Sequence, residues 1–149
     1  MTREEQYQHT VTTLRKLHGE LIVLENDGKF NSARENPTLI GEYLVKLRLN
    51  SSLLFSFMND YIDLLNEALK GTSEKRQGIF MERLALPKSS PTGSEAYARE
   101  MTRVDEANVK IVENELRKIR NEYERYNSIC MTLQSRMKEF DTERRIDGR

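Results

Sequence analysis

The fold is decided by residues 37–69, PTLIGEYLVKLRLNSSLLFSFMNDYIDLLNEAL, because their apolar side chains recur at helical spacing. The steps between core positions alternate between four and three residues, through Ile40, Leu44, Leu47, Ser51, Leu54, Met58, Tyr61, Leu65 and Ala68. An unbroken heptad seam is typical of a long helix that packs against another helix. We therefore expect a helix over residues 37–86, and whether it breaks at Gly71 is left open.

A second heptad seam lies in the C-terminal third of the chain, through Val112, Leu116, Ile119, Tyr123, Tyr126, Cys130, Leu133, Met137 and Phe140. It predicts a helix over residues 94–145, started by a cap at Ser94 or Thr92 and locally unwound near residue 108, where the stripe shifts. Residues 4–26 carry apolar side chains at steps of three and four, which predicts a shorter N-terminal helix.

The two seams are joined by a turn at residues 87–93, PKSSPTG. Two such helices predict an all-α fold, a long antiparallel helical hairpin resembling a coiled coil, in a single domain over residues 1–149. Facing residues should then have numbers that sum to about 180, which pairs Leu47 with Leu133 and Ser51 with Cys130. A register slipped by seven residues keeps the same alternation and stays open.

The apolar face of the second helix is wider than a two-helix seam requires. The surplus side chains predict a homo-oligomer whose interface includes Tyr43, Leu53, Phe57, Ile62 and Leu64. The alternative is a monomeric three-helix bundle in which the first helix covers this surplus.

Composition narrows the class of protein. Lysine plus arginine and aspartate plus glutamate each total 24, so the net charge is zero and no overall attraction to nucleic acid follows. No apolar run is long enough to cross a bilayer, no signal peptide is recognised, and the single Cys130 fits a reducing cytosol. We expect a cytoplasmic protein, in the host cytoplasm if a phage encodes it.

The sequence gives no positive signal for an enzyme. His9 and His18 are nine residues apart and share no metal-binding turn, and Cys130 lies in the seam, where a buried inert thiol is expected. Phosphate-binding glycine loops and Cys/His metal spacings are missing from the sequence. We therefore expect no catalytic residues, no metal site and no cofactor.

Local charge is more informative than net charge. Residues 70–103 carry seven basic groups against four acidic ones, a net charge of +3 at the expected tip of the hairpin. The candidate nucleic-acid-binding residues are Lys70, Lys75, Arg76, Arg83, Lys88, Arg99 and Arg103. Phe80 and Tyr97 lie among these cations and could stack on unpaired bases.

The layout resembles the phage recombination mediators of the UvsY type. The resemblance covers roughly residues 37–145 and rests on EYLVK at 42–46, SEAYAR at 94–99 and LQSRM at 133–137. The family's basic motif, Lys-x-Arg-Leu, has no close copy here, and the nearest cations are Lys70, Lys75, Arg76 and Arg83. The resemblance implies a ring-forming protein that binds single-stranded DNA, displaces the single-strand-binding protein and loads a RecA-like recombinase.

A competing hypothesis is a structural or adaptor coiled-coil protein, for example in phage assembly, that binds no nucleic acid. Neutral net charge and strict heptads favour it. A helical chaperone is a third possibility, which rests on surplus apolar surface alone.

Overall fold

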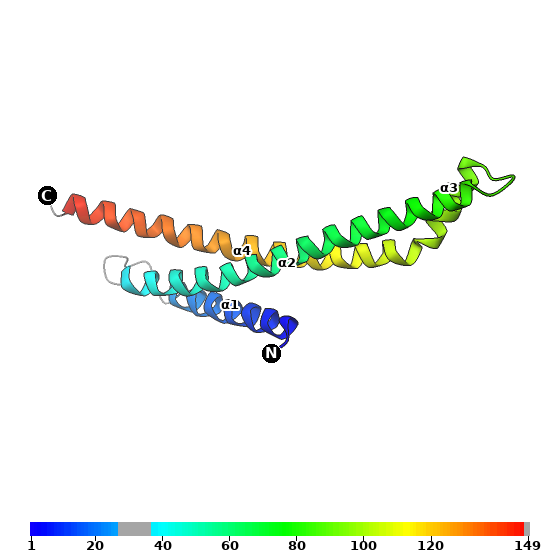
Figure 1. Cartoon of the computed structure of the whole chain (residues 1–149). Helices are drawn as coiled ribbons and strands as arrows, with labels where there is room; N and C mark the ends of the chain where they lie inside the picture. The colour runs from blue at the N-terminus through cyan, green and yellow to red at the C-terminus, as the bar shows by residue number, and fades with distance from the viewer. Residues whose placement is uncertain (27–36, 148–149) are drawn as a thin grey trace. The chain divides into compact units, whose positions relative to one another are not determined.

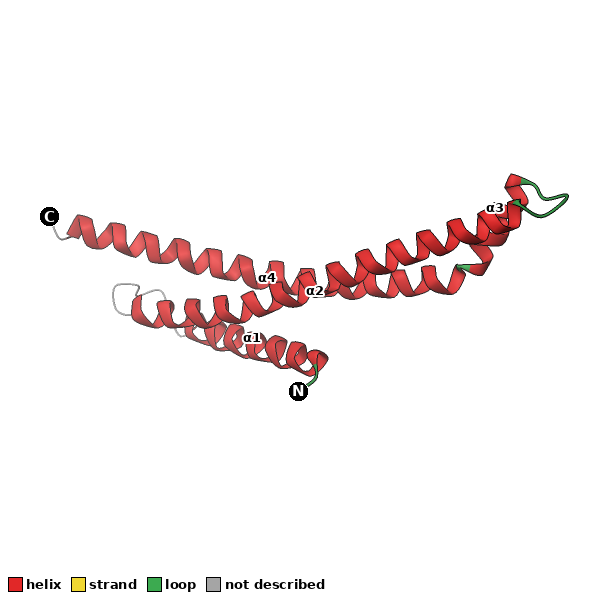
Figure 2. Ribbon diagram, in the orientation of Figure 1, coloured by secondary structure: helices red, strands yellow, loops and turns green. Residues whose placement is uncertain are grey.

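The computed structural model describes residues 1–26 and 37–147, and the side chains of Pro37, Phe140, Glu143, Arg144 and Asp147 lie outside that description. Within these ranges every element is an α-helix, so the predicted all-α class is confirmed (Figure 2). The helices are α1 (Arg3–Asn26), α2 (Pro37–Leu84), α3 (Pro91–Met101) and α4 (Arg103–Asp147) (Figure 1). In the part of the chain that is described, no helix combines the length and apolar character needed to cross a bilayer.

The ends of the helices lie within three residues of the expected ones, and the main difference is where the last predicted helix is interrupted. The third helix begins at Pro91 rather than at residue 94, because Ser90 is its N-cap and accepts a 3.1 Å hydrogen bond from the Gly93 N–H. The interruption expected near residue 108 lies at Thr102, which separates α3 from α4. Helix α2 continues through Gly71, since one glycine costs only about 1 kcal/mol and the flanking residues are good helix formers.

The chain packs as two compact units. Unit 1 comprises Met1–Phe57 and Ile119–Arg149, and unit 2 comprises Met58–Lys118. Helices α2 and α4 each contribute one part to unit 1 and another part to unit 2.

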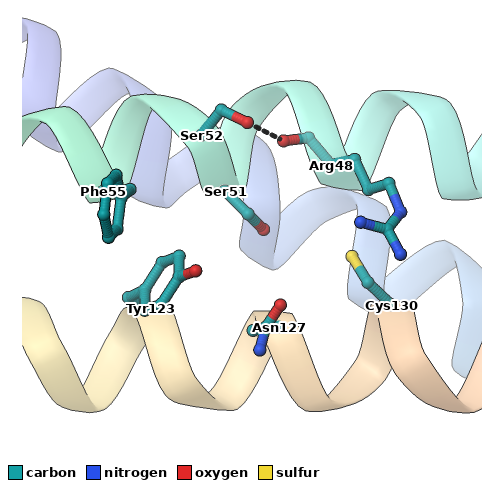
Figure 3. A pocket seen from close by; sticks show the side chains of 7 residues that line it. All are labelled: Arg48, Ser51, Ser52, Phe55, Tyr123, Asn127 and Cys130. Carbon is teal, nitrogen blue, oxygen red and sulfur yellow. Dashed lines mark hydrogen bonds between the residues drawn. The ribbon is translucent and has the colours of Figure 1, made fainter.

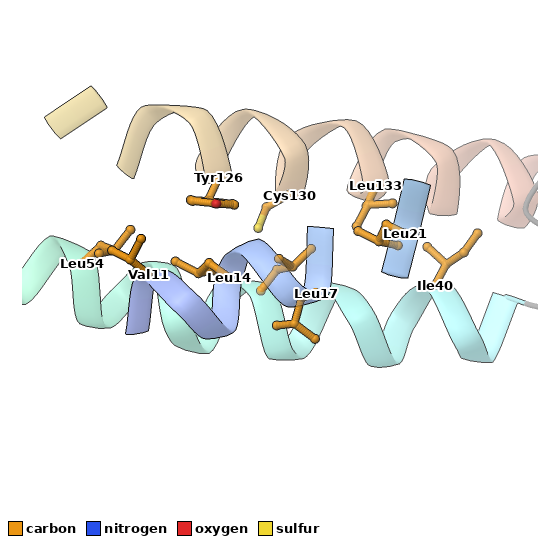
Figure 4. Packing of buried hydrophobic residues seen from close by; sticks show 10 residues of the cluster. Val11, Leu14, Leu17, Leu21, Ile40, Leu54, Tyr126, Cys130 and Leu133 are labelled. Carbon is orange, nitrogen blue, oxygen red and sulfur yellow. The ribbon is translucent and has the colours of Figure 1, made fainter. Parts of the chain in front are cut away.

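Unit 1 is a three-helix arrangement of α1, the first part of α2 and the second part of α4 (Figure 1). Its core takes side chains from all three helices (Figure 4). Helix α1 supplies Leu14, α2 supplies Leu54 and α4 supplies Tyr126, and each of these side chains is fully buried. Leu54 and Tyr126 belong to the heptad positions named from the sequence, which face inward because burying the apolar seam removes it from water.

The register of unit 1 follows from contacts between α2 and α4. Arg48 donates a hydrogen bond to Gln134, and the rings of Phe55 and Tyr123 lie with centroids 5.5 Å apart. From the first pair to the second, the residue number rises in α2 and falls in α4, so these two segments are antiparallel. The residue numbers of the pairs add up to 182 and 178, close to the predicted 180. These values exclude a register slipped by seven residues in this unit.

Helix α1 covers part of the apolar surplus assigned to subunit contacts. Phe57 is buried because the Tyr7 ring packs edge-on against it at 5.6 Å and the Arg3 guanidinium lies over its ring at 4.2 Å. Tyr43 donates a 2.9 Å hydrogen bond to Glu20 of α1. These two side chains contact α1 within unit 1, as the alternative three-helix packing expects, and their place in a subunit interface stays a prediction. Leu53 stays nearly half exposed.

Unit 2 is more thinly packed. It comprises the second part of α2, a turn at residues 85–90, α3 and the first part of α4. Its fully or nearly buried apolar side chains are Ala98, Val109 and Leu116, joined by the polar Ser94 and Thr102. Leu64 remains about half exposed and Ile62 is half-buried in this unit.

Candidate nucleic-acid-binding surface

All seven basic residues singled out from the sequence lie in unit 2, so the fold places them in one compact body. They do not form one continuous cationic face. Five of them have an acidic partner, one stacks on an aromatic ring and one stands apart in the turn between α2 and α3.

Lys75 and Arg76 of α2 are paired across the unit with acidic residues of α4. The Lys75 ammonium lies 2.9 Å from Asp105, and Arg76 pairs with Glu106. Arg76 Nε also donates a 3.2 Å hydrogen bond to Thr102 Oγ1, where α3 gives way to α4. These cations therefore help to hold α2 against α4.

This pairing lowers the local positive charge that the sequence predicts. Residues 70–103 have seven basic and four acidic groups, and extending the count to residue 106 adds Asp105 and Glu106, which gives +1 instead of +3. The two carboxylates were missed because they lie just beyond the counted segment. The register could have found them, since 75 and 105 sum to 180 and 76 and 106 sum to 182.

Three further cations form ion pairs along their own helix or across a helix junction. Lys70 pairs with Glu74 at 4.0 Å, Arg99 with Glu95 at 2.8 Å and Arg103 with Glu100 at 3.7 Å. Exposed pairs of this kind contribute at most about 1 kcal/mol in water. They can therefore open at little cost when a stronger anion approaches.

Arg83 and Tyr97 form the most distinctive feature of the unit. The guanidinium carbon of Arg83 lies 4.3 Å from the centroid of the Tyr97 ring, a cation–π contact between α2 and α3. The pair borders a groove of about 490 Å³ whose apolar lining is Ile79, Leu86 and Met101. Tyr97 is 37% exposed, so its ring is accessible from solvent. Phe80, the other aromatic candidate, is half-buried and does not line this groove.

Lys88 lies in the turn after α2 and has a left-handed backbone with φ of 64°. The turn is stabilised by Ser89, whose hydroxyl donates to the carbonyls of Leu84 and Leu86 at 2.7 Å each. The first of these bonds satisfies the Leu84 carbonyl, which the end of α2 leaves without a helical partner. Lys88 is exposed and has no acidic partner among the described residues, so its charge is uncompensated.

The groups with ordinary catalytic chemistry lie in unit 1. Cys130 is buried, and burial raises the pKa of its thiol, while the facing Ser51 hydroxyl and the Arg48 guanidinium act in the opposite direction. His18 packs edge-on against Tyr126 at 6.3 Å. No group of three or more His, Cys, Asp or Glu side chains suited to a metal ion occurs within residues 1–26 and 37–147.

Comparison with known proteins gives no relative for this chain. No protein-family model, no curated protein and no solved structure matches it.

Proposed function

We propose that the protein is a non-enzymatic single-stranded DNA-binding protein that acts as a recombination mediator. The observation that supports this proposal most is the Arg83–Tyr97 pair, an accessible aromatic ring with a guanidinium on one face, beside an apolar groove. Bases of any sequence stack on aromatic rings, and arginine adds a cation that can reach a phosphate.

The chemistry of such a surface suits an unpaired strand. A base stacked on Tyr97 would pack against Ile79, Leu86 or Met101 along the groove, and Lys88 would meet the backbone that leads into it. Stacking on a single ring is tolerant of sequence, and phosphate contacts make affinity depend on salt. Binding is therefore expected to be sequence-independent and weak for one subunit.

The mediator role extends this binding activity. It rests on the resemblance to the UvsY-type mediators, which implies displacement of the single-strand-binding protein and loading of a RecA-like recombinase in the cytoplasm of an infected host. Assembly of several subunits would raise the effective concentration of weak sites along one strand. Nucleotide hydrolysis would belong to the recombinase.

A second candidate is a structural or adaptor protein that binds other helices. The observation that favours it is a row of apolar side chains on α2, Val45, Leu49 and Leu53, of which the first two are about two-thirds exposed. The neutralisation of Lys75 and Arg76 by Asp105 and Glu106 favours it as well.

A fluorescence-anisotropy titration of labelled oligo-dT separates the two candidates. For the DNA-binding protein we expect binding at low micromolar concentration in about 50 mM salt and clearly weaker binding in about 200 mM salt. The double variant Arg83→Glu with Lys88→Glu should lose most of this affinity. Its matched control, Lys16→Glu with Lys138→Glu, changes net charge equally at exposed positions of unit 1 and should bind nearly as the wild type does. No binding by the wild-type protein in low salt would refute the proposal.

A further inference from the structure

Helices α2 and α4 of unit 1 border a cavity that is open to solvent on one side and that the proposed DNA-binding surface does not use. Its volume is about 270 Å³ (Figure 3). It exists because the facing layer pairs two small side chains, Ser51 and Cys130, which cannot fill the space between two helices. In Figure 3 the rings of Phe55 and Tyr123 line one end, Arg48 and Cys130 line the other, and Ser51 and Asn127 lie between them.

The cavity contains an unused hydrogen-bonding group. Ser51 is only 6% exposed, its hydroxyl points into the cavity in Figure 3, and apart from a weak interaction with the Cys130 thiol its Oγ makes no hydrogen bond to the described residues. A buried hydroxyl is normally hydrogen-bonded, because leaving it unpaired costs free energy. In a helix, a serine hydroxyl can satisfy itself on the preceding turn, as Ser52 does with the Arg48 carbonyl at 2.9 Å, but Ser51 does not.

The one charged side chain that lines the cavity is a cation, Arg48. Arg48 donates to the neutral side-chain oxygen of Gln134, whereas Arg15 and Arg136 of the same unit pair with the carboxylates of Glu122 and Glu25. No aspartate or glutamate lines the cavity. Its polar lining offers the Arg48 guanidinium as the charged donor, with the Ser51 hydroxyl and the Cys130 thiol. The Asn127 side-chain nitrogen donates to Met131 Sδ at 4.0 Å, and its oxygen points into the cavity in Figure 3.

We propose that this cavity binds a small carboxylate. The carboxylate would accept paired hydrogen bonds from the Arg48 guanidinium and a further one from the Ser51 hydroxyl. Its apolar part would pack against Phe55 and Tyr123. Sites for drug-sized ligands span about 300–1,000 Å³, so a cavity of this size fits a compact molecule such as benzoate.

The reactivity of Cys130 can be used to measure whether the site is occupied. It is the one cysteine of the chain and lines the cavity, so a thiol reagent reads out access to this place alone. A bound carboxylate would block the approach of the reagent. It would also disfavour the thiolate through its negative charge, in the same direction as the raised pKa of this thiol.

The test is a titration of the full-length protein with sodium benzoate, followed by amide chemical shifts and by the rate of Cys130 labelling with a disulfide reagent. We expect saturable shifts centred on residues 48–55 and 123–130, with labelling slowed several-fold. Benzamide, which has nearly the same shape without the charge, should bind at least about tenfold more weakly.

Variants make the test specific. Arg48→Met keeps an apolar stem at an exposed position and should weaken benzoate binding at least about tenfold, and Ser51→Ala should weaken it less. Arg120→Met, which removes an exposed charge of α4 that does not line the cavity, should bind as the wild type does. The proposal is overturned if benzoate causes no saturable shifts, if benzamide binds equally well, or if Arg48→Met and Arg120→Met behave alike. Unchanged far-UV circular dichroism would show that the variants are folded.

Discussion

Replacement of Tyr97 by alanine tests the most specific part of the proposed function. The ring lies 4.3 Å under the Arg83 guanidinium and is 37% exposed, so it is held in place yet open to a base. Base–aromatic stacking is worth about 1–3 kcal/mol per base when it is removed by alanine substitution. Because about 1.4 kcal/mol corresponds to a tenfold change in a dissociation constant, Tyr97→Ala should weaken oligo-dT binding by roughly 5-fold to 150-fold.

The assay is the anisotropy titration in low salt, with Tyr97→Phe as the matched control. Phenylalanine keeps the ring and removes only the hydroxyl, so its affinity should stay within about twofold of wild type if stacking is what matters. Thermal unfolding would check that both variants are folded, which we expect because the side chain is partly exposed. Equal affinities of Tyr97→Ala and the wild type, in a protein that does bind oligo-dT, would refute base stacking at this ring.

Three other predictions concern the fold. Leu14→Ala removes a fully buried side chain of α1 and should lower the free energy of unfolding by about 2–5 kcal/mol. Its control, Leu49→Ala on the exposed face of α2, should change that free energy by less than about 0.5 kcal/mol. Similar losses for the two variants in chemical denaturation would contradict the described packing. Amide hydrogen exchange should be slower over residues 40–54 than over residues 65–84, since the first range has three-helix packing and the second lies in the thinly packed unit 2, and the reverse order would contradict this account. Burial raises the pKa of Tyr126, so the folded protein keeps this phenol protonated at a pH above 10, where the unfolded chain ionises it. The free energy of unfolding should therefore fall as the pH rises above about 10. Denaturation curves of Tyr126→Phe should show a smaller fall over the same pH range.

The register could be predicted from the sequence because it depends on a pattern that spans many residues. Heptad steps fix which face of each helix is buried, and the turn fixes the sum of facing numbers. In unit 2 the residue numbers of the Lys75–Asp105 pair and of the Arg83–Tyr97 pair each add up to 180, as the predicted register requires. The position of the helix interruption was less predictable, because at Thr102 it depends on hydrogen bonds to Ala98 and Arg76 rather than on periodicity.

The candidate site was only partly predictable, because charge counts along a sequence ignore partners that folding brings close. Lys75 and Arg76 look like free cations in the sequence, and the fold gives both an acidic neighbour. The Arg83–Tyr97 pair needed the geometry of α3, which is set by the Ser90 cap. The Ser51–Cys130 layer was expected, whereas its cavity depends on side-chain volumes that a heptad pattern does not contain.

The antiparallel register is the central claim, since it places Ser51 against Cys130 and thereby creates the cavity of unit 1. The most direct test measures spin-label distances in unit 1, in a Cys130→Ala background, from residue 48 to each of residues 127, 134 and 141. A slip of seven residues moves α4 by about 10 Å along α2. We predict that the pair 48 and 134 gives the shortest distance, because Arg48 and Gln134 are hydrogen-bonded in the structure. A shortest distance to residue 127 or 141 would contradict the register and the carboxylate site that depends on it.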